Sequence, residues 1–183
     1  MAHMMQCKKT PAKELNFSQI ETFDFNRKVA LPKILIEEII KPSWDKCADD
    51  GDGVQAFIQQ NIAVFGWDGQ LEDLSKLILT NGTLPTPEGY DIVKCDESEN
   101  NIDIMWTTDE MEEEDERMED ELCFVIFTPK ILFFHAGDGD GTRRKEGNAS
   151  VTVPYDLEGK VHVFAFFVNK DRSDYSLAWY EEV

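Results

Sequence analysis

The sequence is poor in the residues that build most metal and redox sites. Its 183 residues include four cysteines and three histidines. The cysteines stand far apart and form no C-x-x-C pair, which excludes a local zinc ribbon or dithiol redox motif and predicts four reduced thiols. The cysteines are Cys7, Cys47, Cys95 and Cys123. The histidines, also too scattered to predict a zinc site, are His3, His135 and His162.

Long apolar segments are missing too. The sequence has no run of about 18 apolar residues, the length that a membrane helix needs. Its first residues, MAHMMQCKKTPAKEL, have no apolar segment like that of a secretory signal. We therefore expect no signal peptide, no transmembrane segment and no membrane partner. The expected location is the cytoplasm or the inside of a virion or similar particle.

Familiar catalytic spacings are absent as well. Ser150, Ser173 and Ser176 lie outside any G-x-S-x-G motif, and no catalytic signature surrounds Cys123. The sequence also has no phosphate-binding loop and no dinucleotide-binding motif. The pattern predicts a protein that is not an enzyme, with no catalytic residue and no cofactor.

Basic residues are scarce beside acidic ones. The chain has 18 Lys and Arg against 37 Asp and Glu, which gives a formal net charge of −19. Long-range repulsion disfavours nucleic acid and anionic membranes as partners. We expect instead a protein partner, either a basic protein or a second copy of the chain.

The acidic residues concentrate in one run, residues 109–121, DEMEEEDERMEDE. Such a run is usually a solvated connection, and it can also contact a basic partner. The basic cluster on the loop at 143–145 is either a solvated loop tip or a contact for the acidic run of another copy. The candidate partner-binding residues are Glu112, Glu113, Glu114, Asp115, Glu116, Arg143, Arg144 and Lys145.

Two loops resemble calcium sites in composition, DDGDG at 49–53 and DGDG at 138–141. An EF-hand needs a bidentate carboxylate at its twelfth position. Counting from Asp49, Asp50 or Asp138 leads to Gln60, Asn61 and Ala149, which do not supply that ligand. The loops are therefore better explained as turns, and no metal site is predicted.

Hydrophobic spacing predicts an α+β fold. Helical periodicity covers residues 31–40, which Pro42 is expected to stop, and residues 54–65. Residues 77–79 are strand-like, and alternating or continuous apolar runs predict later strands at 90–95, 102–107, 122–128, 131–135, 149–153 and 161–168. The run 122–128 is apolar throughout, so both of its faces should be covered. We divide the chain into a flexible N-terminus (1–15), a helical segment (16–73) forming a hairpin, and an antiparallel β-sandwich domain (74–183).

The second half resembles a fibronectin type III or immunoglobulin-like sandwich. The resemblance rests on a tryptophan-bearing strand, IDIMWTT, an apolar strand, LCFVIFTPK, and the closing segment SVTVPYDLEGKVHVFAFFVNKDRSDYS. It departs from the pattern where an aromatic corner residue is usual, since Val161 and His162 stand there. The resemblance implies a rigid frame that presents loops. Independently of it, the alternation in IDIMWTT places Ile102, Ile104 and Trp106 on one face and predicts that Trp106 lies in the core.

Most of the chain, from about residue 9 to 183, also resembles a family of uncharacterised proteins abundant in Bacteroidota, a domain of unknown function. The motifs follow in the same order: KKTPA, IIKPSW, FIQQN, LILTNGTLPTP, IDIMWTT, DELCFVIFTP and VHVFAFFVNKDRSDYS. The resemblance implies a shape and an origin, and it carries over no catalytic residue.

Two functional hypotheses remain open. The first is a non-enzymatic interaction or structural module, such as a subunit of a phage or phage-like assembly, because a sandwich displays loops on a stable frame. The alternative is an acidic inhibitor that mimics nucleic acid and occupies the basic groove of a target protein, which the charge of −19 motivates.

Overall fold

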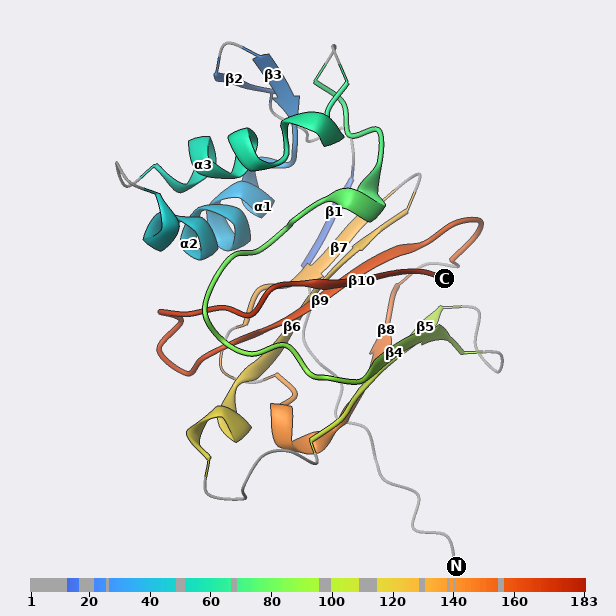
Figure 1. Cartoon of the computed structure of the whole chain (residues 1–183). Helices are drawn as coiled ribbons and strands as arrows, with labels where there is room; N and C mark the ends of the chain where they lie inside the picture. The colour runs from blue at the N-terminus through green and yellow to red at the C-terminus, as the bar shows by residue number, and fades with distance from the viewer. Residues whose placement is uncertain are drawn as a thin grey trace, which may run out of the picture.

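Figure 1 shows the protein as a computed structural model with three layers. The structure describes residues 13–16, 22–25, 27–48, 52–66, 69–95, 100–108, 115–128, 131–137, 139, 141–154 and 157–183. Helices form one layer, a five-stranded sheet the middle layer, and a three-stranded sheet the third. The strands of both sheets pair antiparallel, so the predicted α+β class with antiparallel, sandwich-like sheets is confirmed at this level.

The five-stranded sheet has the order β1-β7-β6-β9-β10. Its strands are β1 (Lys13–Asn16), β7 (Ile131–His135), β6 (Glu121–Phe127), β9 (His162–Val168) and β10 (Trp179–Glu182). The apolar strand β6 lies in the centre and is buried along its whole length, as its composition predicts. Residues 13–15 of the expected flexible N-terminus thus lie in a strand, whereas residues 1–12 are outside the described part of the chain.

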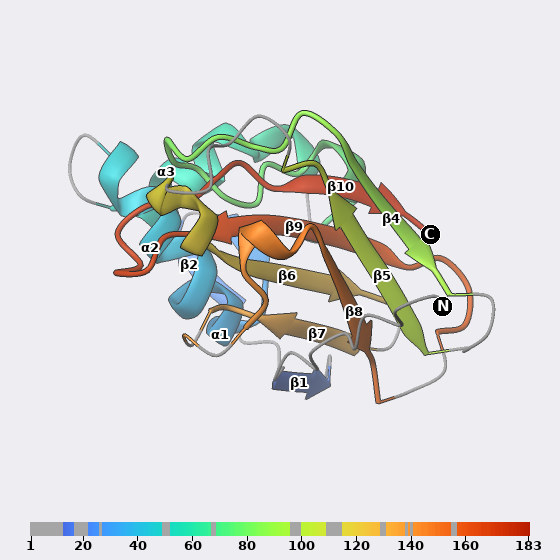
Figure 2. The same cartoon turned by 90° about the horizontal axis from the view of Figure 1, so that it is seen from below.

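The three-stranded sheet has the order β4-β5-β8 and covers one face of the larger sheet. It consists of β4 (Tyr90–Lys94), β5 (Asn101–Trp106) and β8 (Asn148–Thr152). Figure 2, seen from below, shows that its strands cross those of the larger sheet at an angle. The inward residues of β5 are Ile102, Ile104 and Trp106, all buried as predicted.

Each face of β6 contributes to a different core, because successive side chains of a strand point to opposite faces. On the helical side, Cys123, Val125 and Phe127 pack in one buried cluster. On the side of the small sheet, Leu122, Phe124 and Ile126 pack in another. The double burial explains why this strand is apolar without alternation.

The helical layer begins with one continuous run, α1 (Lys33–Leu35), a π-helical turn (Ile36–Ile40) and α2 (Lys41–Trp44). A 3₁₀ turn (Asp45–Cys47) follows, and α3 (Gly53–Gln60) packs against α2. The rings of the two helices meet edge to face, with the centroids of Trp44 and Phe57 separated by 5.7 Å. The helices share their core cluster with the sheet, so this segment has no hydrophobic core separate from it.

The prediction that Pro42 ends the first helix is wrong. The helix continues to Trp44 because the turn before the proline is a π turn, in which the Lys41 N–H bonds to the carbonyl of Ile36, five residues back. A wider turn relieves the clash between a proline ring and the preceding carbonyl groups. Pro42 is therefore accommodated at the beginning of α2.

The prediction of a strand at 77–79 is also corrected. Leu77 and Leu79 are buried and Ile78 is exposed, as in a strand, but no strand pairs with this segment among the described residues. Instead of a neighbouring strand, the side chain of Asn61 bonds to the backbone of this segment. Its Oδ1 accepts from Ile78 N at 2.8 Å, and its Nδ2 donates to Ile78 O at 3.0 Å.

Short elements complete the described chain. Within the segment predicted to be helical, β2 (Thr22–Phe25) and β3 (Arg27–Ala30) form an antiparallel hairpin. Four further 3₁₀ turns connect the larger elements. They are η4 (Ile62–Val64), η5 (Leu74–Lys76), η6 (Glu116–Glu119) and η7 (Arg144–Glu146). The last two lie together and position the charged side chains described next.

Candidate functional site

Two adjacent acidic residues lead into the central strand, and both are buried. Asp120 is 3% exposed and Glu121 is 4% exposed. Because neighbouring residues on a strand point to opposite faces, the two carboxylates enter different surroundings. Buried carboxylates are costly unless they are bonded, so their partners define the chemistry of this end of the sheet.

The Glu121 carboxylate is held by a cradle of donors. Its Oε1 accepts from His135 Nε2 and from Gly141 N, each at 2.8 Å, and its Oε2 accepts from Gly139 N at 2.8 Å. An ionised carboxylate only accepts hydrogen bonds, so the His135 proton lies on Nε2. Arg143 Nη1 is 3.7 Å from Oε2. The carboxylate therefore ties the glycine-rich loop to the strand.

These donors decide the protonation of Glu121. Burial alone raises the pKa of this carboxyl, but the hydrogen bond from His135 and those from the N–H groups of Gly139 and Gly141 outweigh it. Together they lower the pKa to about 2. Position 141 has no room for a side chain, because a Cβ there would lie 2.4 Å from Glu121 Oε1 and 2.7 Å from His135 Nε2.

The Asp120 carboxylate faces a buried arginine. Asp120 Oδ2 and Arg144 Nη2 are 3.1 Å apart, and Arg144 is itself 3% exposed. The guanidinium also donates to Pro85 O at 2.8 Å and lies 4.0 Å from the centroid of the Phe167 ring. Trp106 Nε1 donates to Arg144 O at 2.6 Å. This arginine thus joins both sheets and the chain before β4.

The ion pair between Asp120 and Arg144 is incomplete as a hydrogen-bonded pair. Asp120 Oδ2 and Arg144 Nη2 are close enough for an ion pair that favours the ionised carboxylate, but neither atom completes a hydrogen bond of good geometry with the described residues. Burial is the largest influence on Asp120, and it exceeds the attraction of Arg144 and Arg117. The pKa of this carboxyl therefore rises to about 6. Burial likewise lowers the pKa of Arg144.

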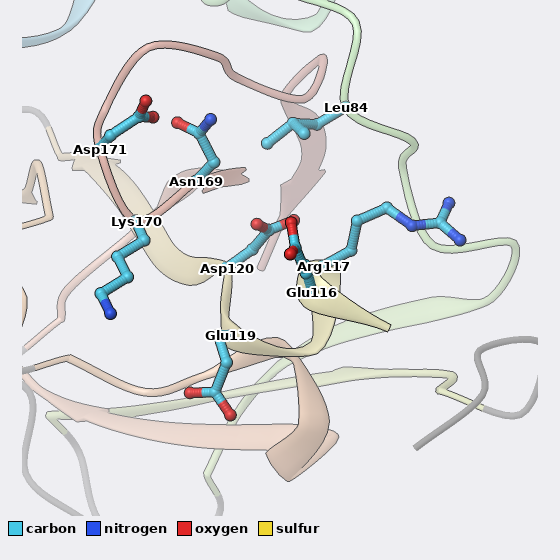
Figure 3. A pocket seen from close by; sticks show the side chains of 8 residues that line it. All are labelled: Leu84, Glu116, Arg117, Glu119, Asp120, Asn169, Lys170 and Asp171. Atoms are coloured by element: carbon cyan, nitrogen blue, oxygen red, sulfur yellow. The ribbon is translucent and has the colours of Figure 1, made fainter. Parts of the chain in front are cut away.

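A pocket of about 760 Å³ opens beside Asp120. It lies between the turn that precedes β6 and the turn that follows β9, and part of the chain before β4 forms one wall. Figure 3 shows the Asp120 carboxylate directed into this space, with Lys170 and Glu119 extending away from it. The lining residues are Leu84, Glu116, Arg117, Glu119, Asp120, Asn169, Lys170 and Asp171.

The pocket combines an apolar wall with acceptor groups. Leu84 supplies the apolar part, and the exposed carboxylate of Glu116 lies at the same opening. The Asn169 amide is already used, since its Oδ1 accepts from the backbone N–H groups of Ser173 and Asp174. The arrangement can accept hydrogen bonds from a cationic group and can exchange a proton on Asp120 near neutral pH.

The acidic residues predicted for partner binding differ in their surroundings. Asp115 is engaged locally, because its carboxylate accepts from Arg117 N and Nε, each at 2.9 Å, and the side-chain bond lowers its pKa to about 2. Glu116 lies on the pocket. The three acidic residues Glu112, Glu113 and Glu114 lie outside the described residues.

The basic cluster contacts the end of the acidic run within the same chain. Arg144 pairs with Asp120, Lys145 pairs with Glu119, and Arg143 donates to the carbonyls of Glu119 and Gly139. The expectation of a solvated loop tip does not hold for Arg144, which is buried. Its planar group with several donors suits a position between a carboxylate, a carbonyl and a ring.

The two calcium-like loops behave as turns where they are described. Asp52 caps α3 by accepting from Gln55 N at 3.1 Å, and Gly139 and Gly141 serve the Glu121 cradle. Asp49, Asp50, Asp138 and Asp140 fall outside the described residues. Within the part that the structure describes, no group of three or more His, Cys, Asp or Glu is placed to hold a metal ion. Cys95 and Cys123 are thiols that take part in no disulfide among the described residues.

Comparisons with known proteins found no relative of this chain. The chain matches no protein-family model, no curated protein and no solved structure. Among the described helices, none has the length and apolar character needed to cross a bilayer.

Sequence reasoning missed the pairing of Asp120 with Arg144 and of Glu121 with His135. One signal was present, because two acidic residues stand directly before an apolar strand that must be buried on both faces. Such a position places at least one carboxylate at the edge of a core and requires donors for it. The pocket walls, Leu84 and residues 169–171, lie far away in sequence and left no local signal.

Proposed function

We propose that the protein is a non-enzymatic interaction or structural module that binds a protein partner of opposite charge. The observation that carries the proposal is an acidic surface on a stable frame. The chain has an excess of 19 acidic residues, and the basic cluster 143–145 makes its contacts with acidic residues of its own chain. The remaining negative charge is available to attract and orient a basic protein.

The strand order supports a fibronectin type III-like version of the sandwich. Counted from β4, the first, second and fifth strands form one sheet, and the third, fourth, sixth and seventh lie in the other. In an immunoglobulin constant domain the fourth strand pairs with the fifth, whereas here it pairs with the third. The added strand β1 and the helical layer extend this plan. The packing of α2 on α3 supports a helical hairpin in that layer.

A rigid frame with charged turns is well suited to recognition. The pocket beside Asp120 lies between two turns that are anchored in the central strands β6 and β9. Turns on such a frame present side chains in fixed positions, which reduces the entropy lost on binding. A subunit of a larger assembly, such as a phage or phage-like particle, is one setting for such a module.

Light scattering on a sizing column tests the proposal. The purified chain is measured at low and high salt, alone and after capture of partners from its native lysate. We expect either a closed oligomer or a stable complex with a basic protein. A chain that remains a monomer and retains no partner at either salt concentration would refute the proposal.

The alternative function, an acidic inhibitor that mimics nucleic acid, rests on the same charge. It differs in its salt dependence, because an inhibitor that replaces phosphate contacts loses affinity steeply as salt rises. It also requires the run 109–121, so neutralising this run should abolish binding to a DNA- or RNA-binding protein. Binding that survives the neutralisation excludes the inhibitor.

A further inference from the structure

We infer that the open edge of β10 takes up an extended, basic segment of the partner protein as one more strand of the five-stranded sheet. This inference rests on the proposed function and names how the basic partner would bind. The partner is identified by its chemistry, a segment in strand conformation that places a lysine or arginine side chain opposite Glu181.

The first argument is that β10 has unused backbone hydrogen bonds. It is the last strand of its sheet, as Figure 2 shows, and among the described strands it pairs with β9 alone. Val183 and Val161 exchange two backbone bonds, of 3.0 and 2.9 Å. In an antiparallel pair only every second residue bonds to its partner, so Tyr180 and Glu182 direct their N–H and C=O groups away from β9. No other described residue bonds to these groups.

This edge is accessible to another chain. Glu181 and Glu182 are exposed, and Tyr180 and Val183 are half-buried. A row of unpaired backbone groups on an exposed edge is the template for strand addition, in which main-chain bonds supply affinity and side chains supply specificity. An added strand would bond to the N–H and C=O groups of Tyr180 and Glu182.

The second argument is the charge of the edge, which decides the kind of strand that fits. Lys160 pairs with Glu182 at 2.7 Å, whereas Glu181 forms no ion pair with the described residues. Burial raises the pKa of Tyr180, and the negative charges of Glu182, Asp73 and Glu181 raise it further, so the surroundings are acidic. A basic side chain opposite Glu181 would form a favourable cross-strand pair.

The same charge opposes pairing with a second copy of the chain. If two β10 edges met antiparallel, with Tyr180 of each bonded to Glu182 of the other, the centre of the pairing would place Glu181 opposite its own copy. Like charges directly opposite each other destabilise a strand pair, and charged residues commonly protect edges in this way. The edge therefore favours a basic strand over a second acidic one.

The third argument is an aromatic surface beside the edge. Tyr90 of β4 is 42% exposed, and its ring centroid lies 5.6 Å from that of Trp179. Trp179 and Glu181 are two positions apart on β10 and lie on the same face of the sheet. The methylene groups of a basic side chain opposite Glu181 would cover this apolar surface while the charged end stays at the carboxylate.

The test uses the full chain, labelled with ¹⁵N, and the peptide acetyl-Thr-Val-Lys-Val-Thr-amide. We expect saturable chemical-shift changes at Tyr180, Glu181 and Glu182, with a Kd of about 1 mM, typical of a few contacts. At about 10 mM peptide, hydrogen exchange at the amides of Tyr180 and Glu182 should slow about fivefold to tenfold, because these groups become bonded. Exchange at Glu181, whose amide faces β9, should change little.

Backbone methylation of the peptide identifies strand addition without altering the protein. With lysine opposite Glu181, the two valines stand opposite Tyr180 and Glu182, so their N–H groups face β10 and the lysine N–H points away. A peptide with N-methyl groups on both valines should bind at least about tenfold more weakly than the parent. A peptide with one N-methyl group on the lysine should bind nearly as well as the parent.

Charge is tested at about 150 mM salt, which screens distant charges. The peptide with glutamate in place of lysine should bind about threefold to tenfold more weakly, because an attractive cross-strand pair becomes repulsive. Glu181→Gln should remove most of this preference. Glu37→Gln, which changes an exposed glutamate of the helical layer, should leave it unchanged.

The outcomes separate this inference from the proposed function. Shift changes away from β10, unaltered exchange at Tyr180 and Glu182, equal binding of the two methylated peptides, or a charge preference that survives Glu181→Gln would each overturn the inference. So would slow exchange at both amides in the chain alone together with a doubled mass, which would show a second copy on this edge.

If the inference fails, the proposed function still stands when the chain forms an oligomer or complex in the light-scattering experiment. If the chain forms neither, the proposed function fails whatever the peptides do.

Discussion

The two neighbouring carboxylates at the start of β6 show what burial does with and without hydrogen bonds. Asp120 and Glu121 are almost equally buried, at 3% and 4% exposure. Glu121 has three close donors and a pKa of about 2, whereas Asp120 has an incomplete ion pair and a pKa of about 6. Similar burial therefore produces opposite shifts, and donor geometry decides the sign.

The difference has a structural reason. The cradle of Glu121 consists largely of backbone N–H groups from a tight loop, which are fixed in place and carry no desolvation cost of a full charge. The partner of Asp120 is a charged side chain that is itself buried and must also serve Pro85 O. A buried ion pair in imperfect geometry does not recover the desolvation of both ions. The Glu121 side is thus built for stability, whereas the ion pair on the Asp120 side does not offset the cost of burying its carboxylate.

Removing the charge of Glu121 should give the largest effect. Glu121→Gln keeps the size of the side chain but turns an NH₂ group toward donors, so we expect a loss of about 3 kcal/mol in the free energy of unfolding at neutral pH. Urea unfolding followed by tryptophan fluorescence measures it. The control Glu119→Gln changes an exposed carboxylate and should cost much less, because solvent screens its pairing with Lys145. If the two variants lost the same free energy of unfolding, the hydrogen bonds to the Glu121 carboxylate would not be the source of its stabilising effect.

The pH dependence should separate the two carboxyls. The folded pKa of Asp120, about 6, lies above its ordinary value of 3.8, so its ionisation opposes folding. The cost is fully present above about pH 6 and disappears as the pH falls to about 4, which amounts to about 3 kcal/mol. The contribution of Glu121 has the opposite sign: it is present above pH 4.5 and is lost as the pH falls toward 2.

Carboxyl ¹³C NMR titration measures both groups directly. We expect Asp120 to titrate near pH 6 and Glu121 to remain ionised to about pH 2. In unfolding experiments, the difference between the wild type and Glu121→Gln should be constant above about pH 5 and should shrink below it. If Asp120 titrates below pH 4, the contrast between the two sites is broken.

Filling the space at Gly141 should disturb the Glu121 side alone. Gly141→Ala places a methyl group against the carboxylate and His135, and we expect a loss of about 2 kcal/mol with a rise in the pKa of Glu121. Gly139→Ala is the matched variant, because a Cβ there has open space and meets only the cost of a φ of +93°. It should leave the pKa of Glu121 nearly unchanged; a similar rise in both variants would show that space is not the cause.

The smallest effect is expected from Trp106→Phe, which acts on the Asp120 side. The substitution removes the hydrogen bond from Nε1 to Arg144 O and should cost about 1 kcal/mol. Hydrogen exchange should become faster at Arg144 and remain slow at Gly139 and Gly141, since their carboxylate acceptor is untouched. Faster exchange at the two glycines would mean that the two sites are coupled.

The strands of the molecule were largely predictable. The uniformly apolar residues 122–128 indicated a central strand covered on both faces, and β6 confirms this. The alternation of Ile102, Ile104 and Trp106 gave the buried face of β5. The helix after Leu31 was recognised, but its end was misplaced because the rule for proline assumes α-helical bonding, which the π turn avoids.

The candidate site was predictable only in composition. The acidic run and the cluster 143–145 were both identified as charged contacts, but their pairing within one chain depends on how β6 and the loop after β7 meet. Leu77–Leu79 shows the same limit. The alternation of buried and exposed residues fits the predicted strand, but the sequence did not reveal that the side chain of Asn61, and not another strand, bonds to the backbone of Ile78.

The sequence by itself determined much of the apolar core, because the spacing of apolar residues follows the period of the strand or helix that carries them. It also determined the excess of negative charge. Only the tertiary structure decided that Glu121 meets a complete set of donors and that Asp120 does not. These donors come from residues 14 to 24 positions away in the chain, and distant partners are brought together by packing, which leaves no periodic trace in the sequence.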